Sequence, residues 1–201
     1  MLANHELVPK SVRMGHSRTT LAVDLASSID DIWTKQLDYT SRKKIRKAER
    51  LQLEFVVDDQ FEHLEEFVEI YTETMHYLDA DPVYLFNDAY FRGYPETLAD
   101  KSTLCLVARA GEVIAGAILM FSGPYAHIHL GGSRRDCLRL RPNDLLYYRA
   151  ALESRNRGAR LMHAGGGRSD SSDDSLLTFK RQFASLSYDY YVTEIALTQR
   201  A

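Results

Sequence analysis

Three strand-length segments joined by two tight turns lie in the middle of the chain, and they constrain its fold more than any other feature. The segments Leu104 to Ala108, Val113 to Phe121 and Tyr125 to Leu130 are predominantly apolar and strand-like. The connecting residues Ala110-Gly111-Glu112 and Ser122-Gly123-Pro124 are types that tight turns favour. The sequence therefore predicts an antiparallel meander of three strands.

The segment after the meander predicts a helix and then a further strand. Pro142 suits the first turn of a helix over about Asn143 to Arg157, and Gly158 suits its end. The short apolar segment Leu161 to Ala164 follows as a strand. Because a strand, a helix and a second strand in this order form a right-handed crossover, we expect the strands near residues 125 and 164 to pair in parallel.

The remaining pattern predicts a mixed α/β (α+β) fold with one largely antiparallel sheet flanked by helices. Residues 1–50 are expected to form an N-terminal extension with a strand and a basic helix, and residues 51–201 a single domain. A loose arm is expected over residues 1–16. The other expected elements are a strand at 19–25, helices from near Asp30 and at 41–50, a strand at 53–57, helices at 61–75 and 87–99, and a strand at 188–197.

Composition and charge exclude several classes of protein. The 201 residues, 45% of them hydrophobic, suffice for one domain with a substantial core. The net charge of −3 argues against a dedicated binder of nucleic acid or membrane surfaces. With only Cys105 and Cys137, neither a disulfide framework nor a zinc cluster is indicated. No apolar run suits a signal peptide or an integral membrane segment, so a cytoplasmic protein is expected.

A glycine triplet and a lysine between two aromatic residues form the main candidate for chemistry. A strand leads into the triplet at 165–167, and a Ser/Asp-rich loop then leads to a helix carrying Phe179, Lys180 and Phe183. A fixed cation can stabilise negative charge that develops in a reaction, which makes Lys180 a candidate for a role in catalysis. The alternative is a solvated helix lysine beside two core phenylalanines, with the glycines as a plain strand-to-loop joint.

Several segments, in this order and spacing, carry a resemblance to a known family. They are the stretches 39–48, 112–117, 125–133, 141–146, 164–167 and 175–183, and together they span most of residues 33–190. In these segments the chain resembles the FemABX-type aminoacyltransferases and the FemAB-like, BioF2-like acetyltransferase domains of the GNAT superfamily. The resemblance implies a GNAT-like fold, in which two neighbouring central strands splay apart beside the acyl donor.

The resemblance also implies an activity, which is N-acyl transfer onto an amine. The donor cosubstrate would be acyl-CoA or aminoacyl-tRNA, with no tightly bound cofactor, and tRNA would then be a partner. The acceptor would be a small-molecule amine or a cell-wall precursor, such as a peptidoglycan peptide. The best-known relatives resemble double GNAT units, whereas this chain is long enough for about one, so a homodimer is one way to complete the site. The stretch 132–141 also lacks the glycines of the usual coenzyme A signature.

The candidate site residues fall into three groups. The resemblance gives Lys180 and Phe179 catalytic roles, with the lysine stabilising negative charge. Four arginines before a helix start could hold a donor phosphate, although an ordinary basic loop is equally consistent with them; they are Arg134, Arg135, Arg139 and Arg141. The residues expected to contact substrate are His127, His129, His163, Gly165, Gly166 and Arg168.

The three histidines allow more than one role. His127 and His129 share one face of a strand by its period of two, and His163 lies on a strand that we expect beside it. Imidazoles can serve as a base or as metal ligands, but no cysteine or carboxylate completes a metal set, so no metal is expected. Packing and core hydrogen bonding are the simpler interpretation.

Two further hypotheses stay open at this level. The basic run Arg42 to Lys47 fits a phosphate-binding surface or a solvated face of an amphipathic helix docked through Ile45 and Ala48. The chain also fits a non-catalytic GNAT-like domain that binds a nucleotide-sugar or a protein, or one half of a hetero-oligomer. Tyr147, Tyr148 or the Ser/Asp-rich loop blocking the opening between the strands would favour the binding domain.

Overall fold

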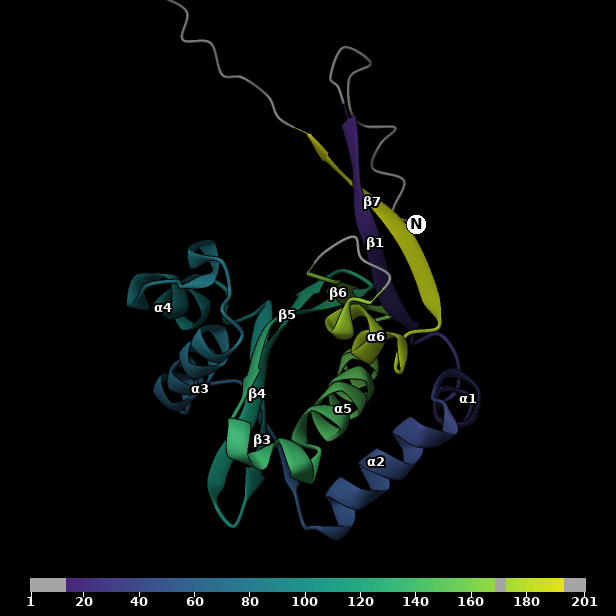
Figure 1. Ribbon diagram of the computed structural model, residues 1–201, viewed down its shortest axis with the longest axis horizontal. Helices are drawn as coiled ribbons and strands as arrows, with labels where there is room; N and C mark the ends of the chain where they lie inside the picture. The colour runs from purple at the N-terminus through teal and green to yellow at the C-terminus, as the bar shows by residue number, and fades with distance from the viewer. Residues whose placement is uncertain (1–13, 169–172, 194–201) are drawn as a thin grey trace, which may run out of the picture.

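One sheet runs through the computed structural model, which describes residues 14–168 and 173–193 (Figure 1). The strands are β1 (Met14–Asp24), β2 (Glu54–Asp58), β3 (Ser102–Arg109), β4 (Glu112–Ser122), β5 (Tyr125–Ser133), β6 (Leu161–Gly166) and β7 (Leu186–Thr193). Within the described ranges they form a seven-stranded sheet in the order β2-β3-β4-β5-β6-β1-β7. Every neighbouring pair is antiparallel except β5 and β6, which are parallel as predicted. The predicted mixed α/β fold is therefore confirmed.

The helices cover both faces of this sheet. They are α1 (Ile29–Asp31), α2 (Tyr39–Arg50), α3 (Leu64–Tyr77), α4 (Asp88–Thr97), α5 (Pro142–Asn156) and α6 (Ser175–Arg181). A π-helical segment, η2 (Ile32–Gln36), and two 3₁₀ turns, η3 (Pro82–Tyr84) and η4 (Arg135–Leu140), complete the elements of the described part. Helices α3 and α4 lie on one face, and α2 and α5 lie on the other (Figure 1).

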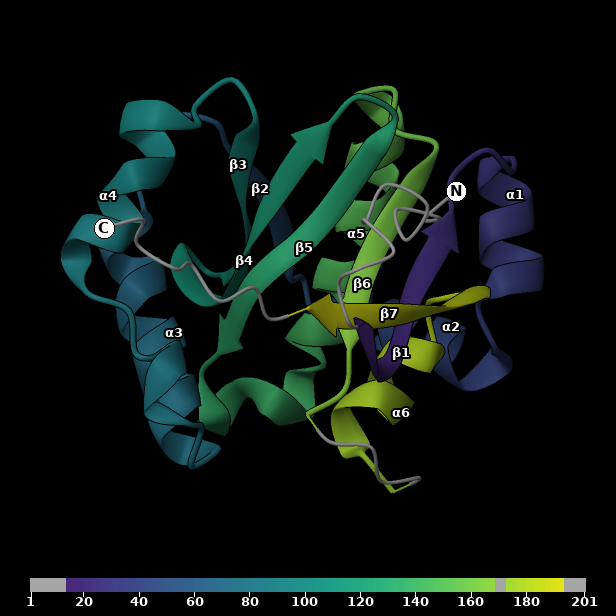
Figure 2. The same cartoon turned by 90° about the horizontal axis from the view of Figure 1, so that it is seen from above.

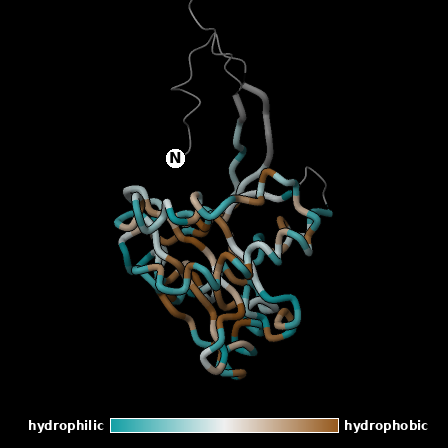
Figure 3. Tube along the Cα trace, turned by 90° about the vertical axis from the view of Figure 1, so that its left-hand side faces the viewer, coloured by the Kyte–Doolittle hydropathy of each residue, from teal (hydrophilic) through white to brown (hydrophobic). Residues whose placement is uncertain are grey.

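The meander β3–β4–β5 forms the centre of the core, because its strands are buried on both faces. Leu104 and Leu106 pack with the α3 side, whereas Cys105 and Val107 pack with the α5 side, as the period of two dictates. All four side chains are buried. In Figure 3 the hydrophobic stretches run through the interior of the body. Burial of each large apolar side chain contributes about 1.5–3 kcal/mol, so the meander is the natural rigid platform of the fold.

Two positive φ angles explain the tight turn between β3 and β4. Ala110 has φ 51° and Gly111 has φ 84°, as the type of two-residue hairpin turn that matches strand twist requires. A glycine accepts this backbone conformation without a steric cost, which is why Gly111 marks the turn in the sequence.

The sheet opens between β5 and β6. Within the described ranges the two strands pair only at Tyr125–Leu161, Ala126–Met162 and His127–His163. Beyond the histidine pair they diverge toward their C-terminal ends (Figure 2). The other side of β6 pairs with β1, so Gly165 and Gly166 stay in the sheet while their β5 side is left without a ladder partner. The splay that the resemblance implied is therefore present.

The N-terminal part of the described chain belongs to this same architecture. Strand β1 lies between β6 and β7, and α2 packs on α5 through the buried Ile45 and Ala48. Residues 14–16 are part of β1, so the arm expected over residues 1–16 is wrong there; its first 13 residues lie outside the described ranges. The last strand ends at Thr193 in the structure, and residues 194–197 of the predicted strand also lie outside. The division of the chain at residue 50 stays a prediction.

Side-chain caps fix where the helices begin. Asp38 accepts a hydrogen bond from the backbone N–H of Ser41 at the start of α2, and Asn87 does the same for Tyr90 at the start of α4. The helix expected from near Asp30 is instead a single α turn that continues as the π-helical η2. In the described part of the chain, no helix combines the length and apolar character that crossing a membrane requires.

Candidate functional site

Lys180 lies buried beside the point where β5 and β6 separate. It is carried by α6, is only 9% exposed, and donates a hydrogen bond from Nζ to the carbonyl oxygen of Gly166 at 2.8 Å. Burial lowers the pKa of Lys180 to about 8, against an opposing effect of the Asp174 carboxylate. The structure thus contradicts the alternative of a solvated helix lysine. A partly desolvated ammonium at the end of a central strand can stabilise a nearby oxyanion.

The glycine triplet makes room for this lysine and for its helix. Gly165 has φ +80°, and a Cβ built on it would lie 2.9 Å from Nζ of Lys180. A Cβ on Gly167 would lie 2.7 Å from the carboxylate of Asp174. These close approaches explain why glycines occupy this strand-to-loop joint. The contact of Gly165 and Gly166 with substrate stays a prediction.

Asp174 links Arg168, just after β6, to the first turn of α6. Its carboxylate accepts hydrogen bonds from the backbone N–H of Leu177 at 2.8 Å and from that of Arg168 at 2.5 Å. Asp174 is therefore the N-cap of α6, and it sets the position from which Lys180 reaches the strand. The Arg168 side chain is exposed at the start of this loop, with Nη2 3.4 Å from Oγ of Ser175.

Phe179 anchors α6 on the core. Its ring lies 5.1 Å from that of Tyr147 and 5.2 Å from that of Phe183, centre to centre. Burial of these rings against α5 fixes the helix whose next residue is Lys180. The structure therefore gives Phe179 a packing role, and its predicted catalytic role stays a prediction.

The three predicted histidines come together at the last paired position of β5 and β6. The rings of His127 and His163 stack with 4.6 Å between their centres, and their Nδ1 atoms are 2.7 Å apart. His163 also forms a short hydrogen bond through Nε2 with the buried hydroxyl of Thr20 on β1. The ring of His129 lies 5.6 Å from that of His127, and its Nε2 is 2.8 Å from the Tyr90 hydroxyl.

This cluster is neutral at neutral pH. Burial, reinforced by the neighbouring charges of His163, His129 and Lys180, lowers the pKa of His127 to about 4. Burial likewise lowers the pKa of His129 and of His163, and the charge of Lys180 adds to the effect on His163. Neutral imidazoles can accept protons and hydrogen bonds, so the cluster can take part in proton transfer.

A local irregularity in β5 aims His129 at α4. The register between β4 and β5 passes from Leu119–Ile128 to Ile118–Leu130, and so skips His129 as at a β-bulge. Bulges re-aim a side chain, and this one lies two residues after the last pair of β5 with β6. The ladder between β4 and β5 resumes at Leu130 and continues to Ser133.

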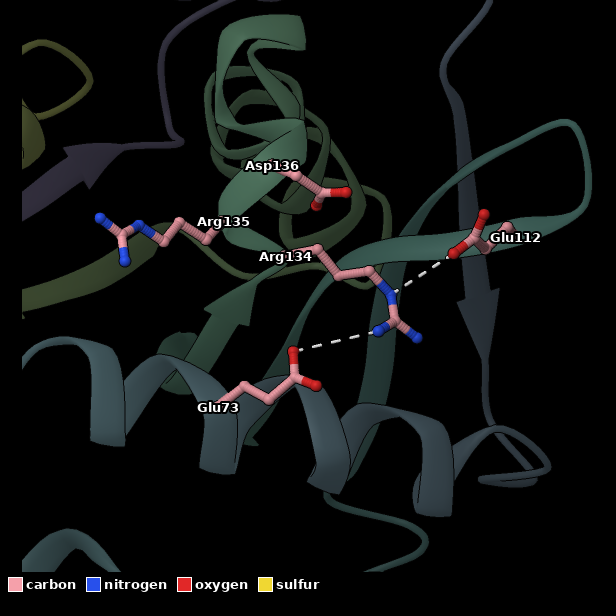
Figure 4. A pocket seen from close by; sticks show the side chains of 5 residues that line it. All are labelled: Glu73, Glu112, Arg134, Arg135 and Asp136. Carbon is pink, nitrogen blue, oxygen red and sulfur yellow. Dashed lines mark ion pairs between the residues drawn. The ribbon is translucent and has the colours of Figure 1, made fainter.

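The predicted arginine loop lies apart from this cluster, at the far end of β5. A cavity of about 600 Å³ is lined there by Glu73, Glu112, Arg134, Arg135 and Asp136 (Figure 4). The Arg134 guanidinium is 3.6 Å from a Glu112 oxygen and 3.9 Å from a Glu73 oxygen. Its Nε also donates to the carbonyl of Val113 at 3.2 Å. A phosphate at Arg134 would therefore compete with two carboxylates.

The start of α5 is poorly equipped for an anion. Pro142 has no N–H to offer, and the residue before it, Arg141, has a left-handed backbone with φ 69°. The buried Asp144 adds a carboxylate in the first turn of the helix, 3.9 Å from Nζ of Lys44. Burial raises the pKa of Asp144, and the Lys44 charge opposes that shift. Together with the missing glycines, this fits the diphosphate of coenzyme A poorly, and the four-arginine phosphate site stays a prediction.

Other kinds of chemistry have little support in the described part of the chain. Cys105 is buried, and burial raises its pKa to about 12, so its thiolate is not available as a nucleophile. Among residues 14–168 and 173–193, no group of three or more His, Cys, Asp or Glu side chains is placed to hold a metal ion.

Three residues of the site had no part in the sequence analysis. Asp174 carries a signal, because an aspartate directly before a predicted helix is a typical N-cap. Thr20 and Tyr90 carry none, since they join the histidines only through strand pairing and helix packing far away in the sequence.

Comparisons with known proteins agree with this architecture. A family model described as an acetyltransferase (GNAT) domain matches residues 35–181. None of the curated proteins compared with the chain matches it.

Three solved structures illustrate the similarity of fold. The crystal structure of FemX has a TM-score of 0.70 and 17% identity, over 92% of this chain and 64% of that one. The structure of L-PGS from Bacillus licheniformis has a TM-score of 0.67 and 15% identity, over 94% of this chain and 63% of that one. The C-terminal domain of a putative lysylphosphatidylglycerol synthetase from Agrobacterium fabrum has a TM-score of 0.62 and 16% identity, over 90% of this chain and 61% of that one. This chain thus spans just under two thirds of each of these proteins.

Proposed function

Because the chain belongs to the acetyltransferase (GNAT) domain family, we propose that it is a FemAB-like N-acyltransferase. It moves an acyl or aminoacyl group from an activated ester or thioester to an amine. The amine attacks the carbonyl carbon directly, so no protein nucleophile is needed.

The observation that carries this proposal is the environment of Lys180. Attack on the acyl carbonyl places negative charge on its oxygen, and a preorganised cation in a partly dry site stabilises that charge strongly. With a pKa of about 8, Lys180 is mostly charged at neutral pH, and burial limits the competition from water. Its hydrogen bond to Gly166 and the capped helix α6 hold it in place beside the splay.

The donor we favour is aminoacyl-tRNA rather than acyl-CoA. The loop where a GNAT domain would hold a diphosphate lacks glycines, Arg134 is paired with carboxylates, and Asp144 adds a buried acid at the start of α5. The basic face of α2 supports tRNA, although two of its lysines already bind protein groups: Lys44 contacts Gln182 and Lys47 contacts the Arg139 carbonyl.

The acceptor amine lies on an amino acid, an amino sugar or a cell-wall peptide. The name of one structural neighbour, lysylphosphatidylglycerol synthetase, describes the making of a lysylated lipid. Phosphatidylglycerol has a hydroxyl and no amine, so its acylation would give an ester, and it enters the same test as the alternative to an amine acceptor.

The two tyrosines that would favour a non-catalytic binding domain by filling the opening lie elsewhere, and residues 169–172 of the Ser/Asp-rich loop lie outside the described ranges. Tyr147 packs against Phe179 and Phe183, and Tyr148 packs 5.1 Å from the ring of Trp33, centre to centre. Both tyrosines thus belong to the core on the α5 face.

The test is a transfer assay with two donors. Acetyl-coenzyme A and lysyl-tRNA are each incubated with a lysine-containing peptide, with glucosamine, or with phosphatidylglycerol vesicles, and acylated product is measured by mass spectrometry. We expect an amide product with lysyl-tRNA, and we expect Lys180→Met to abolish it. Arg181→Met removes the exposed cation next to Lys180 in the sequence and should leave the product in place. A folded protein that forms no amide product with any pair, or that forms only an ester on phosphatidylglycerol, contradicts the proposal.

A further inference from the structure

The hydrogen bonds among the histidines distinguish their ring nitrogens. Nδ1 of His127 lies 3.2 Å from the carbonyl oxygen of His163, and a carbonyl oxygen can only accept. His127 therefore carries its proton on Nδ1. In the neutral ring this leaves Nε2 with a free lone pair, and that atom has no hydrogen-bond partner among the residues that the structure describes.

The same reasoning fixes the tautomer of His163. The proton on Nδ1 of His127 also faces Nδ1 of His163 at 2.7 Å, so that nitrogen of His163 accepts. The proton of His163 is then on Nε2, where it is donated to the hydroxyl of Thr20. Thr20 is buried and belongs to β1, which pairs with β6, so the chain of hydrogen bonds is anchored in the sheet.

His129 has the opposite arrangement. The Tyr94 hydroxyl donates to the Tyr90 hydroxyl at 3.2 Å, which leaves the Tyr90 proton for Nε2 of His129 at 2.8 Å. His129 then holds its own proton on Nδ1 and offers a donor. Of the two β5 histidines, only His127 presents a lone pair that the described residues do not use.

We propose that Nε2 of His127 is the general base for the attacking amine, with His163 and Thr20 as positioning residues that hold it in the required tautomer. This inference rests on the proposed acyl transfer, and it adds a residue that accepts the proton. Lys180 is close enough for its charge to act on both His127 and His163, so the cation and the base flank one end of the splay.

The amine lone pair forms the C–N bond, and the carbonyl electron pair moves onto the oxygen that Lys180 stabilises. An N–H proton of the attacking nitrogen passes to Nε2 of His127. As the oxygen pair returns, the C–O bond of an ester donor breaks, and the leaving alkoxide takes the proton from the imidazolium, which restores neutral His127.

The charged and titratable groups around His127 favour its neutral form. Those that lower its pKa are His129 on β5, His163 on β6 and Lys180 on α6, while Tyr90 and Tyr94 on α4 lie beyond His129. The imidazolium formed during transfer is therefore short-lived, because its neighbours promote return of the proton. A base in this setting is ready over the whole neutral range of pH.

The first test reads the tautomer directly and needs no substrate. In imidazole ¹⁵N NMR spectra of the folded protein, we expect Nδ1 of His127 to be protonated and Nε2 to carry the lone pair, with His127→Gln used to assign the signals. A proton found on Nε2 of His127 overturns the proposal while leaving the acyl transfer intact.

The second test compares turnover among matched variants. We expect His127→Gln to lower kcat by about 10²–10⁴-fold with little change in KM, as for loss of a general base. The control is His76→Gln, a change of an exposed histidine at the end of α3, which should leave kcat unchanged. A His127→Gln protein within about twofold of wild type, when Lys180→Met is inactive, overturns the base and keeps the proposed function. Failure of the wild type to transfer any acyl group overturns both.

The third test concerns the positioning residues. Thr20→Val removes the hydroxyl that fixes the His163 tautomer, so we expect a partial loss of kcat and a loss of the single His127 tautomer in the NMR spectrum. Thr20→Ser should restore both. A Thr20→Val protein with normal kcat and an unchanged spectrum shows that this bond does not position the base.

Discussion

Two cationic regions, Lys180 at the C-terminal end of β6 and Arg134 just after that of β5, have the same charge but different surroundings. Lys180 is buried, bonded to one backbone carbonyl and held by a capped helix. Arg134 lies in a solvent-open loop between two glutamates that are 63% and 67% exposed. Placed in a drier environment, the lysine acts more strongly on a transient charge, whereas water and two carboxylates screen the arginine. Surroundings rather than residue type thus decide which cation can do chemistry.

The largest expected effect is that of removing the buried cation. Lys180→Met keeps the length of the side chain and should lower kcat by about a hundredfold or more, because an oxyanion donor is lost. Steady-state transfer kinetics would measure the loss, and thermal unfolding would show whether the variant is folded. If Lys180→Met kept a kcat within about twofold of wild type, the buried lysine would have no larger catalytic role than the exposed Arg134.

A smaller loss is expected when the lysine is displaced rather than removed. Gly165→Ala puts a Cβ 2.9 Å from Nζ of Lys180 at a residue with φ +80°. We expect a stability loss of about 1–2 kcal/mol from the left-handed backbone and a fall in kcat. The matched control is Gly158→Ala, which has φ +88° and no atom within 4 Å of the added Cβ. It should show a similar loss of stability in thermal unfolding but unchanged kcat; equal kcat in both variants would contradict the steric role.

The pH dependence of transfer separates the two cations in another way. Since the pKa of Lys180 is lowered to about 8, its charge is lost as pH rises through that value, and kcat should fall by up to about tenfold per pH unit above it. An arginine stays charged throughout this range. A pH profile of Lys180→Arg should therefore lack the fall, and the same fall in this variant would assign it to another group.

The smallest effect is expected at the exposed arginine. Arg134→Ala breaks two ion pairs to exposed glutamates, and pairs of this kind contribute about 0–1 kcal/mol. We expect kcat to be unchanged and the KM for either donor to rise by no more than a few fold, as measured in the transfer assay. A large rise in KM for acetyl-coenzyme A alone would identify Arg134 as a phosphate-binding residue and reverse our preference between donors.

The elements bounded by glycine or proline at a turn or a helix end were predictable from the sequence. Gly111, Pro142 and Gly158 mark turns and a helix at the positions where the structure has them, and the parallel pairing of β5 and β6 followed from the crossover between them. The π-helical η2 was missed, because nothing in its residues distinguishes it from an α-helix.

The features of the site that depend on distant pairing were not predictable. Lys180 could be suspected from its neighbours in sequence, but its burial depends on the left-handed Gly165 and on the carbonyl of Gly166. Likewise, the pairing of Arg134 with Glu73 and Glu112 exists only after α3 and β4 have packed beside β5. Contacts of this kind have no local pattern, so composition and spacing cannot reveal them.

The place of β1 between β6 and β7 has a consequence for synthesis of the protein. Thr20 and His163 are 143 residues apart in the sequence. Strand β1 is therefore synthesised well before β6 and β7, the two strands with which it pairs. Closing such a long loop is slow, and a strand edge stays unsatisfied until then. A nascent chain can therefore assemble the β3–β4–β5 meander early. It gains the histidine chain and the contact between Lys180 and Gly166 only after β6 and α6 have been translated.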